Sequence, residues 1–272
     1  MTRIKIIGLC LIAIFATSAM VASAAQAGEV GECVKLAKVG GKYTGKYLDK
    51  NCQTRATSAQ EAEGKKNKYE WSPGVKPANG KFTATSKTAI LEGAAGNIEC
   101  KSSVTVGEWL TNTKDTEQAT FSGCELKGAV DGECHSAGQA NGVIVTNHLN
   151  TELKDEGETS LELNGETFEP KTVGAGEVWD QFQSESGITG IQAEYECASV
   201  IGIRTMGNLA GVFTSGSLNV MSTKSEISFH SGEGAQGLYS EGNEGAGWFP
   251  IGKGVEHLTA KIKNSGKYEI KS

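Results

Sequence analysis

The chain is poor in proline and histidine, and it lacks the short motifs by which many catalytic sites are recognised. It contains no H-E-x-x-H zinc motif, no G-x-S-x-G nucleophile elbow, no P-loop and no EF-hand loop. The four histidines are scattered, so we expect each to be a surface or loop residue: His135, His148, His230 and His257. We therefore expect no catalytic residue, no metal site and no cofactor, and favour a non-enzymatic protein.

The sequence also lacks any long block of charge of one sign. The formal net charge is −6, and acidic and basic residues are interspersed along the chain. A moderately acidic chain without a basic stripe is a poor candidate for binding nucleic acid or an anionic membrane. We therefore expect no nucleic-acid partner.

Long apolar runs are absent apart from one at the N-terminus. Arg3 and Lys5 precede an apolar stretch over residues 6–20, and Ala25-Gln26-Ala27 forms an A-x-A site before Gly28. This order predicts a secretory signal peptide over 1–27, cleaved after Ala27. The alternative is a retained membrane anchor, for which the run is short. The mature chain, with formal charge −8, is expected to be secreted and to contain no membrane span.

Seven cysteines are present, and Cys10 belongs to the predicted leader. An even number of cysteines in an exported chain favours disulfides. Proximity favours Cys33–Cys52 and Cys124–Cys134, which leaves Cys100–Cys197, although six cysteines allow 15 pairings. Haem attachment needs C-x-x-C-H, but Asp131 stands where the first cysteine belongs. The C-x₉-C spacing is unusual for zinc, and a nucleophilic thiol would require an unpaired cysteine.

Alternation of apolar and polar residues predicts many short strands. The 36 glycines show no collagen period, so we assign them to turns, bulges and loops. The fold class expected is mainly β, an antiparallel β-sandwich or irregular β-barrel with disulfides and little helix. In each strand one set of residues should share a face: Ile98, Cys100, Ser102, Val104 and Val106; Val143, Val145, Asn147, Leu149, Thr151 and Leu153; Ile191, Ala193, Tyr195, Cys197 and Ser199; Val212, Leu218 and Val220; Ile227 and Phe229.

Local signals add detail to this outline. Asn164-Gly165 predicts a tight hairpin turn, and Ser58 and Glu61 have capping-box spacing at the start of a short helix that ends near Gly64. Residues 28–82 are expected to form an N-terminal cysteine-bearing segment, and residues 83–272 the main β domain. Within that domain we expect a glycine-rich loop at 231–254 and a last hairpin that turns at 264–266.

Several stretches of the chain resemble a family of secreted, cysteine-bearing actinobacterial proteins that are described only as hypothetical. The resemblance is carried by KYEWSPG, NIECK, TFSGC, GECHSAG, NGVIVTNHLNTEL and YEC, and it covers roughly Cys33 to Phe229. It implies a bacterial origin, export and disulfide bonds. It implies no activity and no catalytic residues.

Three functions remain open. The first is an envelope or extracellular interaction protein that binds cell-envelope polysaccharide or protein. The second is a carbohydrate-binding module, since exposed aromatic rings can stack on sugars; the candidate ligand-binding residues are Trp71, Trp179, Trp248 and Tyr239. The third is a glycoside hydrolase, which needs two carboxylates about 5 to 9 Å apart in a groove. Glu194 and Glu196 are examples of the acidic residues available, on the outward face of one strand. A deep pocket would instead indicate a small-molecule binder.

Overall fold

The computed structural model describes residues 28–94, 96–128, 131–154, 157–163, 166–173, 177–229 and 236–271. Within these ranges it contains nineteen strands and one helix, and the strands pair antiparallel. Three disulfides are present. The prediction of a mainly β, disulfide-bonded fold with little helix is confirmed.

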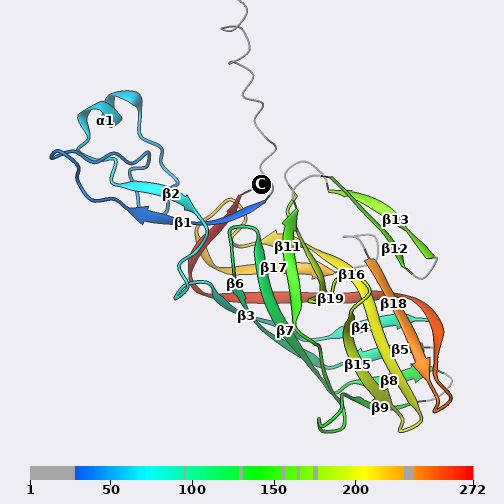
Figure 1. Cartoon of the computed structure of the whole chain (residues 1–272). Coiled ribbons are helices and arrows are strands. Elements are labelled where there is room, and N and C mark those ends of the chain that lie inside the picture. Colours follow the sequence, from blue (N-terminus) through cyan, green and yellow to red (C-terminus); the bar gives the residue numbers. More distant parts are fainter. Residues whose placement is uncertain are drawn as a thin grey trace, which may run out of the picture.

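Residues 81–271 form a closed barrel in which each long strand pairs with the next one along the chain (Figure 1). Most long strands are interrupted by a bend. Thus β4 (Ala89–Gly93) continues β3 (Lys81–Ser86), β6 (Ser102–Trp109) continues β5 (Gly96–Cys100), and β8 (Glu125–Gly128) continues β7 (Lys114–Ser122). The last strand, β19, pairs with β17 and β18 on one side and with β3 and β4 on the other. This pairing joins the two edges of the sheet and selects the barrel over the sandwich.

The barrel strands are, in chain order, β3 Lys81–Ser86, β4 Ala89–Gly93, β5 Gly96–Cys100, β6 Ser102–Trp109, β7 Lys114–Ser122, β8 Glu125–Gly128, β9 Gly132–His135, β10 Val143–Val145, β11 Leu149–Lys154, β14 Trp179–Ser184, β15 Ile191–Cys197, β16 Ile201–Ser215, β17 Ser222–Phe229, β18 Gln236–Asn243 and β19 Trp248–Lys271.

The face that a long strand presents to the core changes where the strand bends. Lys101 separates β5 from β6, and Ile98 and Cys100 are buried before it. After it, Val104 and Val106 lie on the outside, 48% and 56% exposed. The prediction that they share a face with Ile98 is wrong, because a period of two holds only along an uninterrupted strand.

A second change of face occurs at residues 147–148, between β10 and β11. The predicted face is correct for β11, but in β10 the buried residue is Ile144 rather than Val143 and Val145. His148 is exposed, as expected. Ser199 and Val220, assigned to inward faces, are exposed as well. The inward residues of β15 and β17 are confirmed at Ala193, Tyr195, Cys197, Ile227 and Phe229.

Two of the three predicted disulfides are wrong. Cys33 pairs with Cys52 as expected, but Cys100 pairs with Cys124 and Cys134 pairs with Cys197. Cys134 and Cys197 are directly opposite on β9 and β15. The inward phase predicted for Cys100 and Cys197 is correct, and all four barrel cysteines are buried. They nevertheless join neighbouring strands rather than opposite walls, because consecutive strands of a meander lie side by side.

The glycine-rich stretch at 231–254 is not one loop. Residues 236–243 form β18 and residues 248–254 begin β19, and the two strands pair; residues 231–235 lie outside the described residues. The hairpin expected at 264–266 is also absent, because β19 runs through to Lys271. The β17–β19 register shifts there, with Lys224 opposite Lys263 and Ser222 opposite Tyr268. A bulge therefore accounts for the polar residues that suggested a turn.

The N-terminal segment contains β1 (Glu29–Lys35), α1 (Ser58–Glu63) and β2 (Tyr69–Pro73). β1 pairs with β2 and with the end of β19, which attaches the segment to one end of the barrel (Figure 1). The predicted helix is present, but its capping box is formed by Thr57 and Gln60, one residue before the predicted pair. Gly64 ends the helix in a left-handed conformation, with φ of 65°.

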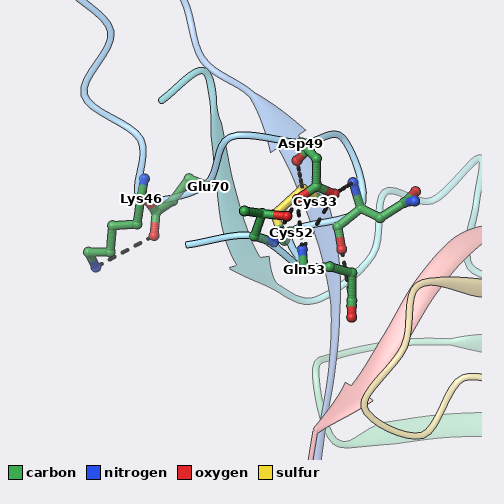
Figure 2. The surroundings of a disulfide bond; sticks show 8 residues. Cys33, Lys46, Asp49, Cys52, Gln53 and Glu70 are labelled. Carbon is green, nitrogen blue, oxygen red and sulfur yellow. Dashed lines mark hydrogen bonds and ion pairs between the residues drawn. A yellow bond between two sulfur atoms is a disulfide. The ribbon is translucent and has the colours of Figure 1, made fainter. Parts of the chain in front are cut away.

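Asp49 organises the loop that carries Cys52 (Figure 2). Its carboxylate accepts hydrogen bonds from the backbone N–H groups of Asn51 at 2.9 Å, Gln53 at 3.2 Å and Thr54 at 2.6 Å. Cys52 has a positive φ of 54°. These bonds stabilise a turn whose backbone is unfavourable for a non-glycine residue, and so place Cys52 opposite Cys33.

A separate hairpin of β12 (Gly157–Leu163) and β13 (Glu166–Val173) lies against β16. The two strands pair on either side of the predicted Asn164-Gly165 turn, which itself lies outside the described residues. The predicted leader over 1–27 also lies outside them. Among the described residues, no helix is long and apolar enough to cross a membrane.

Candidate binding site

The barrel encloses a cavity of about 140 Å³. Its wall is largely apolar and includes Phe82, Phe182, Phe229 and Leu238. A water molecule takes up about 30 Å³ in the liquid, so the space holds roughly five waters or one small organic molecule. An apolar cavity with a few polar groups is the usual form of a small-molecule site.

Aromatic side chains contact one another along the cavity wall. The rings of Trp109 and Tyr268 meet edge to face with centroids 5.9 Å apart, and those of Phe182 and Phe229 do so at 5.3 Å. Tyr268 is 1% exposed, and its hydroxyl donates to Asn264 Oδ1 at 2.8 Å. These contacts give the cavity a rigid aromatic lining.

Four carboxyl groups also line this largely apolar space. Glu117, Asp180 and Glu256 each lie two residues away from a buried apolar residue of the same strand, so the alternation of the strand directs them inward. Asp115 lies two residues before Glu117 and shares its face. The four residues, from β7, β14 and β19, are Asp115, Glu117, Asp180 and Glu256.

Asp115 and Asp180 are the most deeply buried of the four, at 1% and 4% exposed. They come from strands on either side of β11, which carries Thr151 directly opposite Asp115. Both carboxyl oxygens of Asp115, one of Asp180 and the hydroxyl of Thr151 form no hydrogen bond of ordinary geometry. These groups have been removed from water without compensation, which costs free energy.

Burial shifts the titration of both aspartates upward. It raises the pKa of Asp180 to about 7, while the Thr151 hydroxyl opposes the shift. It raises the pKa of Asp115 well above the usual range, and the negative charges of Asp180 and Glu117 raise it further. Desolvation is the main cause in each case, because the ionised form loses its hydration.

Glu117 and Glu256 face the same interior from β7 and β19. Burial raises the pKa of Glu256 to about 7. It raises the pKa of Glu117 well above its usual value, with added repulsion from Asp180 and Glu256. Both residues are half-buried, since their side chains border the cavity space. Gly107 makes room here: a Cβ at this position would lie 2.4 Å from the Phe82 ring and 2.9 Å from Glu117 Cβ.

The remaining polar groups of the wall are mostly paired within the protein. Gln192 Nε2 donates to the Gly207 carbonyl at 2.7 Å, and the hydroxyls of Thr205 and Ser240 are 3.3 Å apart. No Lys, Arg or His lines the cavity in the part of the chain that the structure describes. In the same part, no three His, Cys, Asp or Glu side chains are placed to hold a metal ion.

The four aromatic residues proposed from the sequence do not form one site. Trp179 and Tyr239, at 3% and 4% exposed, pack against Ala210 and Met206. Their expected exposure is wrong, and both are unsuited to stacking on a sugar. Their polar sequence neighbours suggested exposure, but both faces of a strand can be buried. Residues are then inaccessible whichever face of the strand they occupy.

Trp71 and Trp248 are half-buried, and each ring is faced by a cation. The Lys271 ammonium lies 4.1 Å from the centre of Trp71, and the Arg204 guanidinium 4.4 Å from that of Trp248. Arg204 also donates from Nε to Glu241 at 2.6 Å. One ring face is therefore occupied at each tryptophan, which leaves less aromatic surface for a ligand.

A groove on the outside of the barrel gathers residues that the sequence analysis considered separately. Trp248, Glu194, Glu196 and His135 border it. Glu194 and Glu196 are two apart on β15, about 7 Å along an extended strand. This is within the carboxylate spacing of glycosidases, but the groove is open and its two acids are neighbours on one strand.

The four carboxyl groups of the cavity were not predicted from the sequence as site residues. A signal for them exists in the alternation itself, since Asp115 is in phase with Ala119 and Phe121, and Asp180 with Phe182. An acidic residue on the apolar face of a predicted strand marks a buried charge. Their meeting in one cavity can be predicted only when the sheet is known to close into a barrel.

No family model matches the chain, and no curated protein or solved structure matches it.

Proposed function

We propose that the protein is an exported, non-enzymatic binding protein that holds a small, largely apolar molecule inside its barrel. The observation that carries this proposal is the cavity of about 140 Å³ with its aromatic and aliphatic wall. Close packing normally fills a protein interior, so a cavity with room for roughly five waters is a place for a small ligand.

The extracellular setting is supported by two independent features. The N-terminal 27 residues have the order of a cleavable leader, and the six remaining cysteines form three disulfides. Disulfide bonds form and persist in oxidising compartments such as the extracellular space. Membership of the secreted actinobacterial proteins that the sequence resembles is part of the same proposal.

The interior is a better candidate than a macromolecular surface. An interaction protein would be expected to expose a long strand edge or a large apolar patch. Here β19 pairs on both sides along the barrel, and the polar and apolar groups converge inward. The space is also smaller than a disaccharide, which disfavours a glycosidase acting on the interior carboxyls.

The outer groove supports a second, weaker candidate, which is the binding of a polysaccharide. Trp248 beside Glu194 and Glu196 is the observation in its favour. Retention of the oxidised protein on insoluble polysaccharide, lost in Trp248→Ala, would support it. Equal retention of the two forms would exclude the groove as a glycan site.

The interior site can be tested with 2-phenylethanol, a neutral aromatic probe of suitable size, by ¹H–¹⁵N NMR titration of the oxidised mature protein. We expect saturable shifts at cavity-lining amides such as Ala119 and Ala193. Ala193→Leu, which fills part of the space, should weaken binding at least tenfold. Ala59→Leu, the same substitution at an exposed position of α1, is the matched control. Absence of saturable shifts, or shifts confined to the outside, would contradict the proposal.

A further inference from the structure

Two aspartates in the barrel are buried without the partners that such groups normally have. Asp115 and Asp180 are nearly inaccessible, and three of their four carboxyl oxygens form no hydrogen bond of ordinary geometry, since the only described groups near enough to hydrogen-bond with them are each other and the Thr151 hydroxyl. Leaving a buried carboxyl unsatisfied destabilises a protein, and strongly perturbed acids of this kind concentrate at functional sites. No basic side chain lines the cavity in the described part of the chain, so no cation of the protein itself offsets this destabilisation.

We propose that the barrel interior binds an organic cation, namely a protonated primary amine carried on a small apolar or aromatic skeleton. This inference rests on the proposed function and names its ligand class. Asp115 and Asp180 line the same space as the apolar and aromatic residues of the wall. The site therefore offers one ligand both acidic groups and an apolar surface.

The chemistry of an ammonium group matches what the site lacks. A primary ammonium has three N–H donors and no acceptor, so it can serve Asp115, Asp180 and the unpartnered Thr151 hydroxyl together. The aromatic rings nearby, including those of Trp109 and Tyr268, favour a cation further. An anionic ligand would meet four carboxyls and no basic side chain in the described lining.

Binding of such a cation must be coupled to proton release. The titratable groups that face the interior are Asp115 and Glu117 on β7, Asp180 on β14, Tyr195 on β15, and Glu256 and Tyr268 on β19. Burial and mutual repulsion favour the neutral carboxyls when no cation is bound. A bound ammonium favours the ionised form instead, so the amine competes with protons and is released at acid pH.

The test compares three probes of similar size by isothermal titration calorimetry at pH 8 on the oxidised mature protein. They are phenethylamine, a cation; 2-phenylethanol, its neutral analogue; and phenylacetate, an anion. We expect phenethylamine to bind at least tenfold more tightly than 2-phenylethanol, and phenylacetate more weakly than either. At pH 5 the affinity for the amine should fall at least tenfold, while that for the alcohol stays constant.

Three variants assign the effect to residues. Asp180→Asn and Asp115→Asn should each bind phenethylamine no more tightly than the same variant binds 2-phenylethanol. Glu99→Gln, an exposed acid on β5, should behave as the parent protein. Because each Asn removes a buried acid, folding is expected to be retained and is checked by circular dichroism.

The outcomes separate this inference from the proposed function. If the amine and the alcohol bind equally well, or the Asn variants keep the preference for the amine, the cation inference is overturned and the interior site stands. Tighter binding of phenylacetate also overturns it. If neither the amine nor the alcohol binds, the proposed function itself fails.

Discussion

Asp115 and Asp180 face one region of the barrel interior from strands on either side of β11, and the charge of Asp180 raises the pKa of Asp115. The folded protein therefore retains protons that the unfolded chain releases near the ordinary aspartate pKa of 3.8. Protons bound only by the native state link stability to pH. The stabilising contribution is present below the ordinary pKa and is lost as pH rises through about 7 for Asp180.

The ligand-free protein is accordingly expected to be more stable at pH 5.5 than at pH 8.5. Between these two pH values the shift of Asp180 accounts for at most about 2 kcal/mol, because only the interval from pH 5.5 to its raised pKa of about 7 contributes. Asp180→Asn should raise the free energy of unfolding at pH 8.5 by roughly 2 kcal/mol, about 4–8 °C in Tm for a chain of this size. Thermal unfolding at both pH values measures this. A Tm that rises from pH 5.5 to 8.5 would contradict the burial of these acids.

The disulfide pairing gives a second prediction, which peptide mapping of the non-reduced protein can check. Peptides that join Cys100 to Cys124 and Cys134 to Cys197 are expected, and a Cys124–Cys134 peptide would refute this register of the sheet. On the chain-entropy model, removing the bridge between Cys134 and Cys197, 63 residues apart, costs about 4 kcal/mol. The corresponding loss for Cys33 and Cys52, 19 residues apart, is about 3 kcal/mol. Urea unfolding of the two paired alanine variants should show that order.

The fold could be predicted from the sequence as far as local alternation reaches. Ile227 and Phe229 share a face as expected, and so do Ala193 and Tyr195, because each pair lies within one uninterrupted strand. Val104 was misplaced because the bend at Lys101 inverts the phase, and no local signal distinguishes such a bend from a polar residue on a straight strand.

The candidate site could be predicted only in part, for a reason of topology. Asp115 and Glu256 are 141 positions apart, and they border one cavity only because β19 closes the sheet against β3 and β4. Closure is a long-range property that alternation does not encode. Cys100 and Cys197 illustrate the same limit: their inward direction was predicted correctly, whereas their partners depended on which strands are neighbours.

Trp179 and Trp248, two of the three tryptophans proposed for glycan binding, should respond differently to mutation. Trp179 is 3% exposed, so Trp179→Ala is expected to cost about 3–5 kcal/mol through loss of packing. Trp248 is half-buried, and Trp248→Ala should cost about 1 kcal/mol or less. Only Trp248→Ala is thus a sound probe of glycan binding. Equal urea midpoints for the two variants would show that Trp179 is not buried.

The Asp49 loop provides the last prediction. Desolvation raises the pKa of Asp49, but the N–H donors of Thr54, Asn51 and Gln53 outweigh it and lower the pKa below its usual value. The carboxylate form is therefore the one that holds the turn around Cys52. Its contribution is present above the ordinary pKa and is lost as pH falls through the lowered one.

Asp49→Ala should accordingly expose the Cys33–Cys52 bond by loosening the turn, with a loss of about 1–2 kcal/mol for the charged hydrogen bonds. Reduction of this bond by dithiothreitol at pH 7, followed by mass spectrometry, should proceed several-fold faster than in the parent protein. Lys50→Ala, at the exposed neighbouring position, should leave the rate unchanged. Because the loop lies outside the barrel, reduction of Cys134–Cys197 should not accelerate in either variant. If it does accelerate in Asp49→Ala, the loop is coupled to the barrel and its stability is not local.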